Sequence, residues 1–180
     1  MSTLHVENLK GLSSGGNANK IIVPSGQTID ASAGTLLPSA GQIVQALTQE
    51  ITAITTSTTA TQAASGFTLT ITPKSTSSKI RCTVGINGIH ANTVNSCVGF
   101  HLYKNGSHIK YLEDVVGYAS SVSYANNATI MATDSPNTTS AVTYAIYWNR
   151  AFGSGTVYFN NYASGSNRTR SWFTVEEIAQ

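Results

Sequence analysis

Charged side chains are scarce in this chain. Asp, Glu, Lys and Arg make up 10% of its 180 residues, against about 25% in a typical soluble domain. The formal net charge is only +2, which is too small for the electrostatic attraction on which nucleic-acid binding depends. Thr, Ser, Asn, Gly and Ala are abundant instead, so the surface is polar without being charged. Such a surface suits a protein that contacts other subunits or works outside a cell.

Cysteines are few, and long apolar runs are absent. Cys82 and Cys97 are too few for a disulfide framework and have no paired metal-ligand spacing, so we expect two reduced residues in the core. The chain has no run of about 18 apolar residues, the length needed to span a membrane. Its first residues, MSTLHVENLKGLSS, do not follow the pattern of a secretory signal. We therefore expect a protein that is assembled in a cytoplasm and does not insert into a membrane.

Motifs for catalysis are missing as well. There is no G-x-S-x-G nucleophile elbow, and GLSSGG (residues 11–16) lacks the lysine of a phosphate-binding loop. The adjacent carboxylate pairs Glu113–Asp114 and Glu176–Glu177 would point to opposite faces of an extended strand, so neither pair supplies the facing acid and base of a glycosidase. We expect no catalytic, cofactor or metal site, and no enzyme activity.

The stretch Phe67–Ile86 shows the pattern on which the fold prediction rests. Apolar residues alternate with polar ones in FTLTIT (67–72) and again in IRCTVGI (80–86). This period of two predicts two half-buried strands around a turn-rich segment. Further strands are predicted at 123–132, 142–150, 156–161 and 171–178. About eight strands without a convincing helix predict an all-β fold, an antiparallel jelly-roll sandwich over residues 67–180.

The stretch Phe100–Tyr111 carries the clearest local signal. Asn105-Gly106 favours a two-residue type I′ turn, since both residues tolerate positive φ, and this turn pairs Tyr103 with His108. The register predicts two faces. The core face consists of Phe100, Leu102, Ile109 and Tyr111. The outward face consists of His101, Tyr103, His108 and Lys110.

His101 and His108 lie diagonally across this predicted outward face. They could join a metal site, within one chain or around a three-fold axis. Two histidines on a strand are more often part of a polar surface, and we favour that interpretation.

Residues 1–40 do not have the pattern of a compact domain. Short apolar bursts such as IIV (21–23) are separated by Gly- and Ser-rich breaks, and such a segment cannot bury its own apolar side chains. It is either a flexible tail or an extended N-terminal arm that becomes ordered against other chains or a larger particle. The apolar bursts favour the arm.

Residues 41–66 fit two interpretations. The Thr-rich, β-branched composition favours a strand. A short trimerisation helix stays open, because coiled-coil spacing is present at Val44, Leu47, Ile51 and Ile54.

One cluster combines basic and aromatic residues: Tyr162, Arg168, Arg170 and Trp172. It could hold a sugar or an acidic polymer by stacking and hydrogen bonding. A loop with solvent-facing arginines beside a core tryptophan is the simpler interpretation.

Several motifs, taken in order, resemble the fibre and appendage proteins of tailed bacteriophages, particularly those of marine and cyanobacterial phages. NANKIIVPSGQTIDASAGTLLPSAGQIVQ (residues 17–45) is similar to a recurrent arm sequence of that group. Successive strands of the group's C-terminal jelly roll are similar to ITPKSTSSKI, LYKNGSHI, DSPNTTSAVTYAIYW, GTVYFN and FTVEEIAQ. The resemblance runs from about Asn17 to Gln180 and preserves the order of the motifs.

This resemblance implies a virion protein: a homotrimer of tumour-necrosis-factor-like jelly rolls whose arm attaches to other virion proteins. Residues 1–66 leave no room for a long shaft, so we expect a short tail fibre or tail appendage whose head contacts a host surface glycan or protein. The alternative is a capsid decoration or head-fibre protein that docks on the capsid through its arm. The candidate receptor contacts are Tyr118, Tyr124, Tyr162, Arg168 and Arg170.

Overall fold

The computed structural model describes residues 13–16, 21–27, 38–117, 126–161 and 169–180. The chain divides into two units, Met1–Leu37 and Pro38–Gln180. In the first unit, Ile21 and Ile22 are exposed. The rest of the expected arm lies largely outside the described residues, so its role in attachment stays a prediction.

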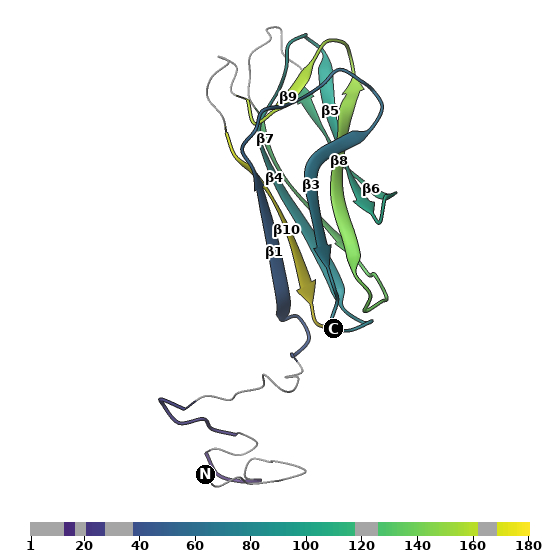
Figure 1. Cartoon of the computed structure of the whole chain (residues 1–180). Helices are drawn as coiled ribbons and strands as arrows, with labels where there is room; N and C mark the ends of the chain where they lie inside the picture. Colours follow the sequence, from purple (N-terminus) through teal and green to yellow (C-terminus); the bar gives the residue numbers. More distant parts are fainter. Residues whose placement is uncertain (1–12, 17–20, 28–37, 118–125, 162–168) are drawn as a thin grey trace. The chain divides into compact units, whose positions relative to one another are not determined.

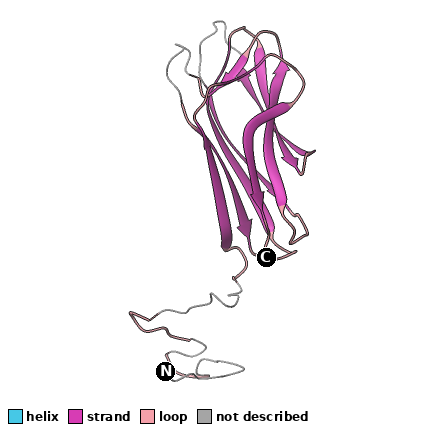
Figure 2. Ribbon diagram, in the orientation of Figure 1, coloured by secondary structure: helices cyan, strands magenta, loops and turns pink. Residues whose placement is uncertain are grey.

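The described part of the second unit is built from strands, without a helix (Figure 2). The strands, which Figure 1 labels except for β2, are β1 (Ile43–Ile51), β2 (Thr55–Ser57), β3 (Ala63–Ile71), β4 (Lys79–Ala91), β5 (Ser96–Lys104), β6 (Ser107–Gly117), β7 (Asn126–Asp134), β8 (Val142–Phe152), β9 (Val157–Phe159) and β10 (Ser171–Ile178). No helix in the described residues is long and apolar enough to cross a membrane.

The strands form two antiparallel sheets. One, which we name the β4 sheet, has the order β1-β10-β4-β9-β2, with β7 also paired to β4. The other, the β5 sheet, has the order β3-β8-β5-β6. Strand β4 is long enough to pair with β10 through Lys79–Gly85 and with β9 through His90–Ala91.

The order in which the chain visits the two sheets identifies the sandwich as a jelly roll. From β3 to β10 the chain crosses between the sheets at every connection except β5 to β6 and β9 to β10. Strands adjacent in sequence therefore face each other across the core, as in the double Greek key of jelly rolls. The predicted fold class is confirmed.

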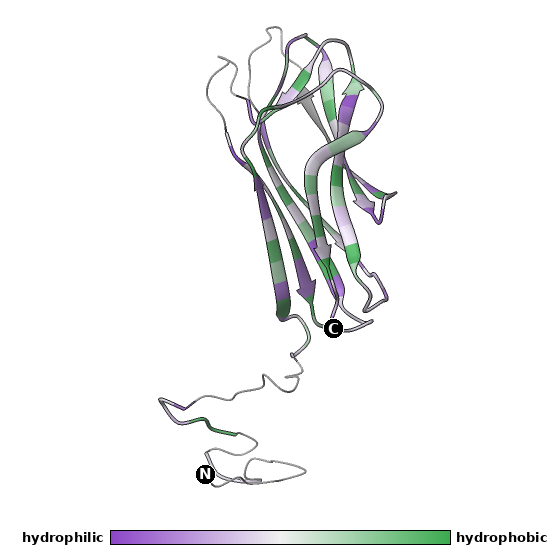
Figure 3. Ribbon diagram, viewed as in Figure 1, coloured by the Kyte–Doolittle hydropathy of each residue, from purple (hydrophilic) through white to green (hydrophobic). Residues whose placement is uncertain are grey.

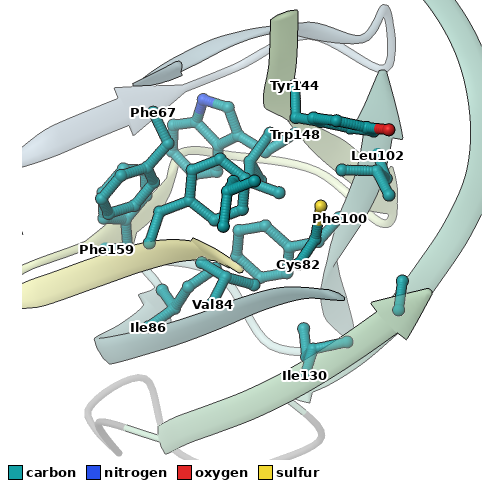
Figure 4. Close-up of a cluster of buried hydrophobic side chains, with 14 of the residues drawn as sticks. Phe67, Cys82, Val84, Ile86, Phe100, Leu102, Ile130, Tyr144, Trp148 and Phe159 are labelled. Atoms are coloured by element: carbon teal, nitrogen blue, oxygen red, sulfur yellow. The ribbon is translucent and has the colours of Figure 1, made fainter. Parts of the chain in front are cut away.

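The core lies between the sheets and is rich in aromatic rings (Figure 4). Phe67, Phe159 and Trp148 are at most 1% exposed. The rings of Phe67 and Phe159 lie 6.3 Å apart, and Trp148 meets Phe159 edge to face at 4.9 Å. Burying each such side chain contributes about 1.5–3 kcal/mol to the stability of the fold. The outward residues between them are mostly polar, so hydropathy alternates along the strands (Figure 3).

The two cysteines agree with the prediction, since Cys82 and Cys97 are both free and buried.

The boundary of the sandwich differs from the prediction. Residues 41–66 contain β1 and β2, of which β1 pairs with β10 along its whole length, and Leu47 packs against the core. The segment is therefore strand rather than helix, and the sandwich begins near Pro38 rather than at Phe67.

Candidate binding surface

The β5–β6 hairpin turns as its sequence predicts. Asn105 and Gly106 have φ values of 48° and 79°, and Tyr103 pairs with His108. Beyond that pair the ladder is interrupted by two register shifts, between Leu102 and Tyr103 and between Phe100 and His101. Each β-bulge adds a residue to one strand and so moves the following side chains to the other face.

The two β-bulges change which residues of the hairpin share a face. His101 pairs with Tyr111, and Leu102 pairs with Lys110. Tyr111 therefore leaves the predicted core face, and Lys110 lies on the opposite side of the hairpin from His101, although it is exposed at the sheet edge. Ile109 was also expected in the core but is 37% exposed, because it is the extra residue between His108 and Lys110.

The outcome is a continuous group of rings on the β5 sheet, on the side away from the core. We name it the aromatic face, and it consists of His101, Tyr103, His108, Tyr111 and Tyr147. Tyr103 and Tyr147 stack with their ring centroids 3.8 Å apart. The ring of His101 lies 5.4 Å from that of His108 and 5.1 Å from that of Tyr111, both edge to face.

Hydrogen bonds fix two of these rings and connect them, directly or through Asn149 on β8, to the chain before β3. The Tyr103 hydroxyl donates to Oε1 of Gln62 at 2.6 Å. Nε2 of His101 lies 3.0 Å from Oδ1 of Asn149, and Nδ2 of Asn149 donates to the Ala60 carbonyl at 2.7 Å. The predicted outward residue His101 is consequently only 5% exposed; neighbouring side chains cover it although it points away from the core.

Four of the predicted receptor contacts lie outside the described residues: Tyr118, Tyr124, Tyr162 and Arg168. Arg170 is exposed and forms an ion pair with Glu50 at 3.0 Å, so as a receptor contact it stays a prediction. Trp172, expected in the core beside it, is half-buried instead and lies over Gly85 on the outward side of the β4 sheet.

The aromatic face has the chemistry of a shallow binding surface. It offers ring surfaces together with hydroxyl, imidazole and amide groups, a combination that binds polar ligands by packing and hydrogen bonding. Sequence reasoning found His101, Tyr103 and His108, but it missed Tyr147, which comes from a distant strand. Within the described residues, no group of three or more His, Cys, Asp and Glu side chains is arranged to hold a metal ion.

No protein-family model matches the chain, and the comparison with curated proteins gave no match. The chain is distantly similar to the crystal structure of the infectious bursal disease virus VP2 subviral particle, with 12% identity, a TM-score of 0.36 and coverage of 88% of this chain and 42% of that one. It is similar to the structure of the Gt strain of the same virus, with 12% identity, a TM-score of 0.31 and coverage of 88% and 43%. The chain thus spans less than half the length of these structures.

Proposed function

We propose that this chain is a non-enzymatic structural protein of a bacteriophage virion: a short homotrimeric tail fibre or tail appendage whose jelly-roll head contacts the host surface. The sequence resemblance to phage appendage proteins and the jelly-roll order of the strands support this role. The observation that carries it is the contrast between the outward sides of the two sheets, one of which suits self-association and the other ligand binding.

The outward side of the β4 sheet carries an uncharged row of side chains in cross-strand register, beside the Arg81–Glu176 ion pair and Trp172. One row runs across four strands from Thr48 to Thr174, Thr83 and Met131. Met131 is 63% exposed, and the hydroxyls of Thr48 and Thr174 lie 2.9 Å apart. We name this row the threonine face. This row buries no charge when a second copy covers it, and Met131 offers exposed apolar surface, so we propose that it forms the trimer contact.

The aromatic face then lies on the opposite sheet and stays accessible in a trimer. Three copies in one appendage would multiply weak individual contacts with a repetitive host surface by avidity. We therefore propose the aromatic face as the receptor-binding surface, in addition to the loops that the sequence analysis indicated.

Light scattering on the full chain and on residues 38–180 tests the assembly. We expect both to have three times the monomer mass, because the threonine face belongs to the sandwich. Thr83→Lys places a charge in the proposed contact and should give monomers, whereas Thr70→Lys, on the outward side of the β5 sheet, should leave the trimer intact. A monomeric full chain would contradict the fibre proposal and favour the capsid-decoration alternative.

Binding of the purified chain to host cells tests the receptor role. Tyr111→Ala should reduce cell binding without changing the mass in solution, and Thr70→Lys serves again as the control. Equal binding by both variants would place the receptor contacts elsewhere on the head. Labelling of the chain on intact particles then decides between a tail and a capsid location.

A further inference from the structure

His101 is held in one orientation by its neighbour on β8. Because Nδ2 of Asn149 donates to the Ala60 carbonyl, the amide turns its oxygen toward the imidazole. Asn149 Oδ1 is an acceptor, so Nε2 of His101 carries the ring proton and donates it. Nδ1 of His101 is left as an acceptor, and this buried atom has no hydrogen-bond partner.

The unpartnered nitrogen lies toward β6. Strand β5 is between β8 and β6 in its sheet, and Nε2 of His101 is bonded to Asn149 on the β8 side. We infer that Nδ1, the other ring nitrogen, faces the edge strand that carries His108. The two imidazole rings are in contact, with centroids 5.4 Å apart and planes inclined by 66°.

We propose that Nδ1 of His101 and a ring nitrogen of His108 bind a late first-row transition-metal ion, of the class Cu²⁺, Ni²⁺ or Zn²⁺. Imidazole is a preferred ligand of these ions. With metal–nitrogen bonds of about 2.0–2.1 Å in tetrahedral geometry, two imidazole rings have their centroids about 5 Å apart, close to the separation in this structure.

The surroundings of His101 are those of a metal ligand. Histidines that bind metals generally donate their second ring N–H to an oxygen acceptor, which fixes the tautomer and the ring orientation, and Asn149 has this role for His101. His108 is exposed on the hairpin, so rotation of its side chain admits the ion. The described residues supply no third His, Cys, Asp or Glu, so water completes the coordination and the ion stays open to an external ligand.

Isothermal titration of the untagged full chain with CuCl₂, NiCl₂ and ZnCl₂ tests the site. We expect one ion per chain, tightest for Cu²⁺, and no binding of Mg²⁺ or Ca²⁺, which prefer oxygen ligands. His108→Ala should weaken binding at least about ten-fold, a loss of about 1.4 kcal/mol. Lys110→Ala, also exposed on β6, and His5→Ala in the arm should bind as the natural chain does.

Histidine ¹⁵N NMR with ZnCl₂ gives a second readout that does not depend on stability. The Nδ1 resonance of His101 and one nitrogen of His108 should shift, while Nε2–H of His101 persists. Unchanged affinity in His108→Ala, shifts confined to His5 or His90, or no binding by the natural chain would each overturn the proposal. The metal site does not rest on the proposed virion role, so neither result depends on whether the chain forms a trimer.

Discussion

Glu177 and Gln45 are joined by a hydrogen bond between the first and last strands of the sandwich. Nε2 of Gln45 on β1 donates to Oε2 of Glu177 on β10 at 2.6 Å, and the backbone N–H of Lys74 donates to Oε1 at 2.7 Å. Glu177 is 0% exposed. The carboxylate thus ties the first and last strands of the sandwich to the turn between β3 and β4.

The same contacts set the ionisation of Glu177. Burial raises the pKa of this carboxyl group, but hydrogen bonds from Ser78, Gln45 and the backbone of Lys74 and Ser75 together lower it by more, so the pKa lies below its ordinary value. A carboxylate with a lowered pKa in the folded state stabilises the fold above its unfolded pKa of about 4.3. That stabilisation is lost as the pH falls through the folded-state pKa.

We expect Glu177→Gln to lower the free energy of unfolding by about 2–3 kcal/mol at pH 7, because an amide replaces an acceptor that several donors share. The difference should shrink as the pH falls from the unfolded pKa of about 4.3 through the lower folded-state pKa, below which the natural carboxyl group is protonated. Urea denaturation of both proteins at neutral and acid pH measures it.

Glu176→Gln is the matched control for this measurement. Glu176 is adjacent in sequence but partly exposed, and it pairs with Arg81 at 2.7 Å. Partly exposed ion pairs contribute about 0–1 kcal/mol, so Glu176→Gln should have little effect. Equal losses from the two substitutions would show that Glu177 has no special role.

Gly85 and Trp172 form a second cross-strand pair with a steric consequence. A Cβ atom added at Gly85 would overlap the Trp172 indole. Gly85→Ala should therefore displace the indole and cost about 1–3 kcal/mol, measured by thermal unfolding together with tryptophan fluorescence.

A double-mutant cycle separates this clash from other effects of Gly85→Ala. Trp172→Thr removes the indole and leaves a side chain that suits the outward side of the β4 sheet. Gly85→Ala should cost clearly less in that variant. An equal cost in both backgrounds would rule out the indole as the cause.

Local features of the fold can be predicted from the sequence, whereas pairings between distant strands cannot. The strand alternation after Phe67 and the Asn105-Gly106 turn are local signals, and both are confirmed. β1 was ambiguous because the four-residue spacing of Leu47 and Ile51 fits one face of a strand as well as one face of a helix. Its partner β10 is at the far end of the chain, and pairing with it decides the conformation.

The aromatic face was predictable only in part. A β-bulge leaves no compositional mark. The sequence prediction therefore assigned Ile109, Lys110 and Tyr111 to faces on the assumption of an unbroken ladder, which the protein does not have. The burial of His101 depends on Asn149 and Tyr147, which no local pattern connects to it. The stacking of Tyr103 on Tyr147 is likewise a product of strand order.

Cys82 offers a prediction about reactivity. Burial, with a smaller contribution from Asp134, raises the pKa of its thiol to about 12. Because the thiolate is the reactive form, Cys82 in a Cys97→Ser variant should not react with Ellman's reagent at pH 8 in the folded protein. It should react fully in urea. Rapid reaction without denaturant would mean that this part of the core opens readily.

His90 gives the stability of the fold a pH dependence. The ring is buried and stacks on Tyr158, with centroids 4.5 Å apart and planes inclined by 4°. Burial lowers the pKa of His90, although the backbone of Gly88 and Asn161 acts in the opposite direction. The unfolded chain therefore takes up a proton at this residue at a higher pH than the folded chain does.

The expected stability contribution is complete above the unfolded pKa of about 6.5 and declines as the pH falls toward the folded-state value. His90→Gln cannot take up this proton, so the free energy of unfolding should fall less between pH 7.5 and pH 5 than in the natural chain. Urea denaturation across that range provides the comparison, and the other histidines contribute equally to both proteins. Parallel pH profiles would show that His90 is protonated as readily in the fold as outside it.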